Sequence, residues 1–408
     1  MSDVGAIGAS RATRQRNELA AMRALHRFRR LSRAELARFL GLNRSSSGHI
    51  VAGLTQEGLV REVGALAQAR GLHAHAGRPG ILIELVPEAA VFLGVEIGVE
   101  HITTVEIDLA SRIVSANAVP FAGASTDVGA AVAQAVGRAF ESLSPERLER
   151  CEGIGVAVPA QMDRHGRVRV APLLGWENVQ LADLVRAALP VPLPVLVEND
   201  ANAFAIGASY GRSEPHSGVA LFLVMESGVG GGIIVDGSLF RGAHGLAGEI
   251  GHLRVQGGDA PERSLEEVLG LECILTDYRS TAPAGEPTFA AFLADVRDRV
   301  PGAVAIAERW ARALAFGLIQ ACRMIDADRI VLGGSVAALY PLMAARVLHY
   351  IQAMQEASFP LPAIETNDDE TIGPAFGAAC MLHQRYLSNE ESPRLAEPPP
   401  LQDPAPPA

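Results

Sequence analysis

The residues best suited to chemistry lie in a few polar segments between positions 197 and 267. VENDANA (197–203) places an amide beside a carboxylate, and GSLFRGAHGLAGEIGH (237–252) with SLEE (264–267) adds further carboxylates and a histidine. A carboxylate within reach of a hydroxyl can take its proton, while neighbouring amides and acids can orient a hydroxyl-bearing ligand by paired donors and acceptors. Asn199 and Asp200 are equally suited to capping a helix that begins at Ala201, which is compatible with binding.

Three glycine-bearing segments, LGVEIG (93–98), ESGVGGG (226–232) and VLGGS (331–335), each follow an apolar strand. Backbone N–H groups in such turns can approach a phosphate closely. Each segment alone could equally be only a tight turn. The elements that must position all these segments alternate between strand and helix from about Ala89 to Tyr386, which predicts an α/β architecture.

Residues 15–87 are expected to form helices followed by a hairpin. Apolar residues at near-helical spacing predict a first helix of about Arg16–Arg29. SRAE (32–35) is a capping box, in which serine and glutamate satisfy each other's free backbone N–H groups, and Gly41 ends the second helix. The residues expected to face inward are Leu19, Met22, Leu25 and Phe28 in the first helix, and Leu36, Phe39 and Leu40 in the second.

A third helix, RSSSGHIVAGLTQEGLV (44–60), is expected to begin at a cap formed by Asn43, with Ile50 and Leu54 facing inward. Small and polar residues at the start of a helix after a short turn suit entry into the DNA major groove. The alternative is a small packing domain with no nucleic-acid contact. The predicted base-reading residues are Arg44, Ser45, Ser46 and His49.

Two short apolar segments, LVREV (59–63) and ILIEL (81–85), predict a two-stranded wing around an Ala/Gly/His-rich loop. Arg70 and Arg78 in this loop could enter a narrow A·T-rich minor groove. These elements together predict a winged helix-turn-helix that binds double-stranded DNA.

Charge is distributed unevenly along the chain. Residues 1–87 carry 13 arginines and 6 acidic residues, whereas residues 88–408 carry 22 arginines and 40 acidic residues. This asymmetry is typical of a basic nucleic-acid-binding module joined to an acidic body. All basic residues are arginine, which excludes any mechanism that needs a lysine.

Membrane insertion and a cysteine-based site are not expected. The chain has no run of about 18 uncharged apolar residues and no signal-peptide core, so a cytoplasmic protein is predicted. Its cysteines are scattered and are expected to be buried free thiols: Cys151, Cys273, Cys322 and Cys380.

Together with GIGVAVPAQMD (153–163) and APLLGWENV (171–179), the segments above occur in an order that resembles the ROK family of repressors and sugar kinases, over about residues 15–387. The resemblance implies a two-lobed, actin-like (ribonuclease H-like) fold of the sugar-kinase type, with a ligand cleft between the lobes. The expected divisions are a flexible leader (1–14), the winged helix-turn-helix (15–87), a first lobe (88–210), a second lobe (211–372), a C-terminal helix packing back on the first lobe (373–387) and a disordered tail (388–408).

The resemblance also implies residue roles. In the family's kinases the aspartate that corresponds to Asp200 is the general base. The sugar-contacting set implied for this chain is Asn199, Asp200, Glu249, His252 and Glu266.

Departures from the family pattern point away from catalysis. The first phosphate loop, DxGGT in the family, is EIGVE (96–100) here, and Glu226 replaces a glycine before the second loop, where Ser227 takes the place of threonine. A carboxylate near the phosphate position is a like-charge contact, and phosphoryl transfer depends on positioning and charge neutralisation. We therefore expect weak or absent ATP binding and no kinase activity, with Asp200 a vestigial base.

The zinc and sugar motifs are altered as well. The family's CxCGxxGC stretch is GGDAPERS (257–264), which has no thiolate, so no zinc is expected although His252 remains. Ala160 and Leu173 replace a glycine and an asparagine of the sugar site, so the effector is expected to differ from glucose or N-acetylated sugars.

The sequence therefore predicts a transcriptional regulator, interpreted as a repressor, that binds a two-fold operator as a homodimer or a dimer of dimers and senses a carbohydrate-like effector. Two alternatives stay open. One is an active sugar kinase with a DNA-binding head, and the other is a DNA-binding scaffold without a ligand.

Overall fold

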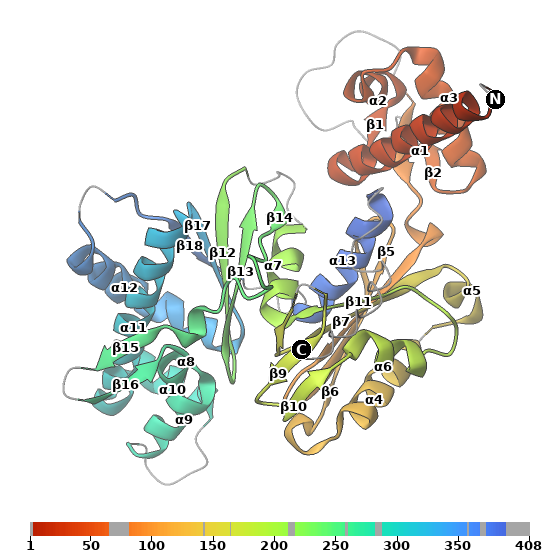
Figure 1. Cartoon of the computed structure of the whole chain (residues 1–408). Coiled ribbons are helices and arrows are strands. Elements are labelled where there is room, and N and C mark those ends of the chain that lie inside the picture. Colours follow the sequence, from red (N-terminus) through yellow and green to blue (C-terminus); the bar gives the residue numbers. More distant parts are fainter. Residues whose placement is uncertain are drawn as a thin grey trace, which may run out of the picture. The chain divides into compact units, whose positions relative to one another are not determined.

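The computed structural model describes residues 3–64, 81–141, 143–163, 165–210, 217–257, 260–281, 288–356, 359–367 and 373–388. It divides into two compact units. The head unit contains the chain up to Val86, the short stretch at 165–166 and the end of the chain from His383; the body unit contains the rest. Each unit is described by itself (Figure 1).

The head unit has three helices in its described part, followed by a small antiparallel sheet of order β1-β3-β2. The capping box forms as predicted: Ser32 Oγ accepts from Glu35 N–H, and Ser32 N–H donates to Glu35 Oε2 at 2.8 Å. Gly41 ends the second helix in the left-handed region, with φ 64°. The elements are α1 (Asp3–Phe28), β1 (Leu31–Ser32), α2 (Arg33–Leu40), α3 (Arg44–Gln56), β2 (Val60–Val63) and β3 (Leu82–Leu85).

Several predicted boundaries in the head unit are wrong. Helix α1 begins at Asp3, so residues 3–14, expected to be a loose leader, are helical; alanine and arginine in this stretch favour helix. Helix α3 ends at Gln56 rather than Val60, because Gly58 turns the chain with φ 73° and frees Val60 to pair in β2. The pairing of β1 with β3 was not predicted.

The expectation that Phe28 and Phe39 face inward is also wrong. Their exposed fractions are 44% and 50%, whereas Leu36 is fully buried. The two rings instead meet edge to face with centroids 5.5 Å apart. Helical spacing identifies a stripe of apolar residues, but here the end of each stripe extends past the core, where one phenylalanine partly covers the other.

The first lobe of the body unit has a sheet of order β11-β7-β4-β5-β6. The β11–β7 and β7–β4 pairings are parallel, and the β4–β5 and β5–β6 pairings are antiparallel. Helices α4 and α6 cover one face, where Val132, Val136 and Val185 join the sheet in one apolar core. The elements are β4 (Val91–Ile97), β5 (His101–Asp108), β6 (Ile113–Pro120), α4 (Val128–Glu141), α5 (Pro145–Leu148), β7 (Cys151–Val158), β8 (Gln161–Met162), β9 (Val168–Ala171), β10 (Trp176–Val179), α6 (Leu181–Ala188) and β11 (Val195–Asn199).

The second lobe repeats this arrangement, with the order β14-β13-β12-β17-β18, two parallel pairings and two antiparallel ones. Strand β12 alternates as a sheet covered on both faces requires: Leu221 and Leu223 face the α11 side, whereas Phe222 and Val224 face α7. The elements are β12 (Val219–Met225), β13 (Val229–Val235), β14 (Ser238–Leu239), β15 (Arg254–Gly257), β16 (Ala260–Ser264), α8 (Glu266–Leu269), α9 (Leu271–Arg279), α10 (Phe289–Arg297), α11 (Pro301–Ile325), β17 (Arg329–Gly333), α12 (Tyr340–Met354) and β18 (Ala363–Thr366).

Helices α7 (Asp200–Tyr210) and α13 (Pro374–Leu387) pack closely on neighbouring backbone. A Cβ at Gly94 would lie 1.9 Å from the carbonyl oxygen of Ala375, and one at Gly377 would lie 1.7 Å from that of Ala203. Glycine is therefore needed for α13 to approach both β4 and α7. Tyr210 ends α7, but α7 also packs on the second-lobe sheet, so the side chains of α7 serve both lobes.

None of the helices in the described ranges combines the length and the apolar character that crossing a bilayer needs.

Candidate ligand cleft and nucleic-acid interface

The start of α3 is exposed on one face and buried on the other. Arg44, Ser45 and His49 are exposed, and Ser46 is half-buried. Asn43 caps the helix, since its Oδ1 accepts from Ser46 N–H at 2.8 Å. The buried side of the helix is formed by Ser47, Ile50, Val51 and Leu54. The predicted base-reading residues thus lie away from the core, whereas predicted Arg70 and Arg78 lie outside the described residues.

Asn199 and Asp200 lie where β11 meets α7, and both cap the helix as the sequence allowed. Asp200 Oδ1 accepts from Ala201 N–H at 2.8 Å, and Asn199 Oδ1 accepts from Asn202 N–H at 3.0 Å. Asn199 Nδ2 also donates to Asp200 Oδ1 at 2.9 Å and to the carbonyl oxygen of Ala160 at 3.1 Å. Capping and ligand contact are therefore both open to this pair.

The Asp200 carboxyl has an unusual proton affinity. Burial, followed by the negative charge of Glu96, raises the pKa of Asp200 to about 7. Near neutral pH the group therefore exchanges between a neutral acid and a carboxylate. Such a group can either donate to or accept from a sugar hydroxyl.

An ion pair between a buried carboxylate and a partly exposed guanidinium, which the sequence motifs did not single out, supports Asn199 and Asn202. Glu198 is 4% exposed, and its Oε2 accepts from Arg241 Nε at 3.1 Å and Nη2 at 2.7 Å. Its Oε1 accepts from Asn199 N–H and from Asn202 Nδ2. Glu198 belongs to the first lobe and Arg241 to the second, so the pair joins the two lobes beneath the cleft.

Glycines hold the Glu249 segment against β13. A Cβ at Gly248, where φ is 95°, would lie 2.1 Å from the carbonyl oxygen of Gly231, and one at Gly251 would lie 2.0 Å from that of Val229. This approach brings Glu249 and His252 to the first lobe's edge. A small cavity lies there, lined by Ala160, Met162, Asn199, Asn202, Gly230, Gly231, Gly245, Ala247, Gly248 and Glu249.

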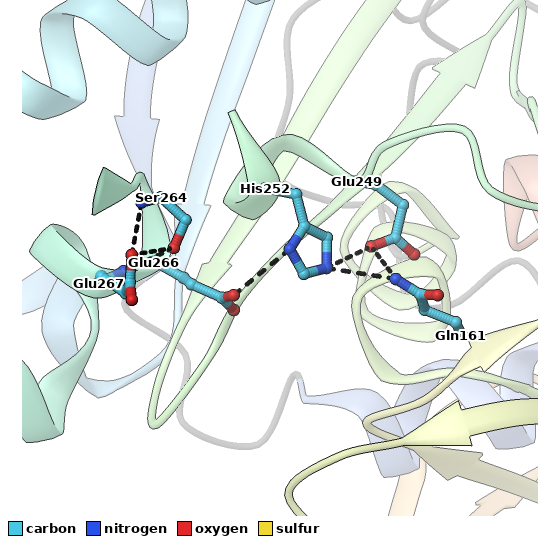
Figure 2. Close-up of polar contacts among 6 residues, drawn as sticks. All are labelled: Gln161, Glu249, His252, Ser264, Glu266 and Glu267. Carbon is cyan, nitrogen blue, oxygen red and sulfur yellow. Dashed lines mark hydrogen bonds and ion pairs between the residues drawn. The ribbon is translucent and has the colours of Figure 1, made fainter. Parts of the chain in front are cut away.

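Glu249, His252 and Glu266 lie together, as shown in Figure 2. His252 Nε2 is 3.4 Å from Glu249 Oε2, and its Nδ1 is 3.4 Å from Glu266 Oε1. Burial raises the pKa of Glu249. A first-lobe residue absent from the predicted set, Gln161, also reaches this group. Of the predicted set, Asn199 and Glu249 line the cavity, whereas Asp200, His252 and Glu266 are not among its lining residues.

The glycine-bearing loops lie at strand ends, and one of them is filled by the protein's own carboxylate. Glu226 Oε1 accepts from the backbone N–H of Ser335 and Oε2 accepts from its hydroxyl, each at 2.6 Å. In the first loop, His101 Nε2 lies 3.8 Å from Glu96 Oε2, and this contact raises the pKa of His101. Acidic side chains therefore stand at two of the loops that resemble phosphate-binding turns.

Of the stretch expected to have lost zinc ligands, Gly257 lies in β15 and residues 260–264 form β16, which pairs antiparallel with β15; residues 258 and 259 lie outside the described residues. Within the described residues, no group of three or more histidine, cysteine, aspartate or glutamate side chains could hold a metal ion. The cysteines are free: Cys151 and Cys380 are buried, and Cys273 and Cys322 are partly buried. These residues do not fit a structural zinc site.

Comparison with known proteins identifies the family. The ROK family model matches residues 92–385. A xylose repressor from Bacillus spizizenii is 28% identical over 226 residues, which cover 55% of this chain and 56% of that protein. A glucokinase from Streptomyces coelicolor is 35% identical over 164 residues, covering 40% of this chain and 49% of the other. The chain thus spans about half the length of these two curated relatives.

The fold has a solved counterpart. A crystal structure of a ROK family transcriptional regulator, described as a homologue of the E. coli MLC protein, superposes with a TM-score of 0.72 at 18% identity. The match covers 92% of this chain and 98% of that one. The α/β, two-lobed architecture is therefore that of known ROK structures.

Proposed function

Because the chain belongs to the ROK family, we propose that it is a DNA-binding transcriptional repressor controlled by a carbohydrate-like effector, and that it is not an enzyme. One observation carries the proposal: the polar side chains of Asn199, Asn202 and Glu249 line a cavity, while Glu226 occupies the donors of Ser335. A xylose repressor among the relatives supports the same assignment.

The effector site consists of Asn199, Asp200, Glu249, His252 and Glu266, which would bind a neutral sugar. The carboxylates of this set disfavour a phosphorylated or acidic ligand, because like charges in a partly buried site repel. No ATP, zinc or other cofactor takes part.

The head would read the operator with Arg44, Ser45, Ser46 and His49 in the major groove, and with Arg70 and Arg78 in the minor groove. A two-fold operator calls for a homodimer or a dimer of dimers. The protein would then act in the cytoplasm, together with the DNA. The effector would shift the equilibrium between lobe arrangements and thereby change operator affinity.

The test is selection of bound DNA from a random library, with and without candidate sugars, followed by affinity measurements. Arg44→Ala should weaken binding to the selected site by roughly 10- to 100-fold, because a base contact contributes about 1–3 kcal/mol. Binding to random DNA should weaken far less. Arg23→Ala, an exposed arginine of α1, is the matched control for the charge change. Equal losses on all sequences would contradict base reading by Arg44.

The glucokinase relatives and the presence of Asp200 favour one alternative, an active kinase with a DNA-binding head. It requires ATP-dependent phosphorylation of some sugar, abolished by Asp200→Asn. We expect no turnover across a broad sugar panel. A scaffold without a ligand is tested by the same panel, since a sugar that binds the folded state must raise its melting temperature.

A further inference from the structure

Gln161 lies at the meeting point of two second-lobe groups, although it belongs to strand β8 of the first lobe. Its Nε2 is 3.4 Å from Glu249 Oε2 and 3.2 Å from His252 Nε2 (Figure 2). On the other side of the imidazole, Nδ1 is 3.4 Å from Glu266 Oε1. These four side chains form one polar chain, which we call the Gln161–His252 relay.

The hydrogen-bonding capacity of each group fixes the direction of the relay. An ionised carboxylate can only accept, so Gln161 must present its NH₂ group, and not its carbonyl oxygen, to Glu249. The same NH₂ group lies 3.2 Å from His252 Nε2, whereas the acceptor Glu249 Oε2 lies 3.4 Å from that nitrogen. The shorter contact, which is with the donor, favours an Nε2 that accepts and carries no proton. The proton of the neutral ring is then on Nδ1, where it faces Glu266.

Local hydrogen bonds between Ser264 and Glu267 stabilise the second-lobe end of the relay. Ser264 N–H and Oγ–H donate to Glu267 Oε2 at 2.6 and 3.1 Å, and Glu267 N–H lies 3.3 Å from Ser264 Oγ. This capping box fixes the start of α8, where Glu266 lies. Arg254, two residues after His252, pairs with Ser264 across the β15–β16 hairpin. The hairpin therefore holds His252 and Glu266 at a constant separation.

We propose that Gln161 is a positioning residue of the effector site, which holds His252 in the Nδ1–H tautomer and sets how the ring meets the effector. This inference rests on the proposed function, since the effector is the group that His252 would meet. Gln161 and Glu266 orient the ring from opposite sides, so the site needs no metal for this purpose. Because the relay crosses from one lobe to the other, it forms only when the lobes hold the arrangement described.

The tautomer can be measured without any effector. Full-length protein labelled with ¹⁵N at histidine is compared by NMR at pH 8 as wild type, Gln161→Met and His252→Gln, the last to assign the signal. We expect the Nδ1–H pattern for His252 in the wild type, unchanged by a metal chelator, and a mixture with the Nε2–H form in Gln161→Met. Methionine has nearly the shape of glutamine but cannot donate. Gln134→Met, at an exposed position of α4, should leave the pattern unchanged.

A second experiment, in which an effector is added, distinguishes this inference from the proposed function. For a sugar found by thermal screening, Gln161→Met should lower affinity roughly tenfold, as expected when a hydrogen-bonded polar group is lost from a partly buried site. If no sugar binds, the proposed function fails, but the tautomer measurement still decides the role of Gln161. An unchanged tautomer in Gln161→Met, or a wild-type pattern that a chelator alters, would overturn the inference. Gln161→Leu serves as the second variant if Gln161→Met does not fold.

Discussion

The two halves of the cleft are built in opposite ways. In the half around Asn199, the supporting groups are buried: the side chain of Glu198 is 5% exposed and pairs with Arg241. In the half formed by the glycine-bearing loops, Glu226 makes exposed hydrogen bonds to Ser335. The first half directs side chains at a cavity, whereas the second satisfies its donors with its own carboxylate.

The difference shows which half of the cleft can accept substitutions with little loss of stability. Replacing a buried, paired charge leaves its partner uncompensated, so the half that contains Glu198 is constrained by stability as well as by binding. Glu226 is only partly buried and its partner Ser335 is exposed, so this loop contact carries a weaker constraint. Sugar recognition can therefore persist on this fold while the phosphate loops diverge.

The largest effect on the free energy of unfolding is expected in the half of the cleft that contains Glu198. Arg241→Met leaves the Glu198 carboxylate buried without its cation, which should lower the free energy of unfolding by about 3 kcal/mol. Arg309→Met is the matched control, because Arg309 and Asp277 form an exposed pair with side chains 57% and 40% exposed. That variant should lose less than about 1 kcal/mol. Urea unfolding measures both, and equal losses would remove the contrast between buried and exposed pairs.

The resemblance implied a set of five ligand-contacting residues, and the contact of that set with a sugar stays a prediction. The structure places three of its members together, since His252 lies 3.4 Å from Glu249 and 3.4 Å from Glu266. Arg241 and Gln161 were not predicted, because each reaches a residue of the other lobe and no local spacing encodes that contact.

The head unit shows the same limit of prediction from sequence. The capping box at Ser32 was predicted correctly, since both partners lie within one turn. The exposure of Phe39 was not, because helical spacing locates an apolar stripe but not how far the neighbouring helices extend to cover it. Short-range hydrogen bonds are thus readable from sequence, and burial at the end of an element is not.

An intermediate effect on stability is expected for Asp200, whose pKa is raised by burial and by the charges of Glu96 and Glu249. The folded-state pKa of Asp200, about 7, lies above its unfolded value of about 3.9. The folded state therefore binds a proton that the unfolded chain has released, and this contribution to stability is present below pH 4 and lost as the pH rises through 7.

Asp200→Asn cannot titrate, so the stability of the wild type relative to this variant should fall from pH 5 to pH 8, by up to about 1.4 kcal/mol per pH unit. Unfolding at several pH values measures it. Glu96→Gln should weaken the same dependence, because the Glu96 charge contributes to the raised pKa of Asp200. A wild-type advantage that stays constant from pH 5 to pH 8 would show that Asp200 is ionised in the folded state throughout this range.

The smallest effect is expected at Glu226. In Glu226→Gln the amide oxygen can still accept from Ser335 N–H, so only the charge of two exposed hydrogen bonds is lost and the free energy of unfolding should fall by less than about 1 kcal/mol. Glu226→Gly removes both bonds and should cost somewhat more, yet still less than Arg241→Met. Thermal and urea unfolding of the three variants side by side give the ranking. If Glu226→Gly proved as damaging as Arg241→Met, the carboxylate of Glu226 would be a structural support equal to the Glu198 pair, and the two halves of the cleft would be constrained alike.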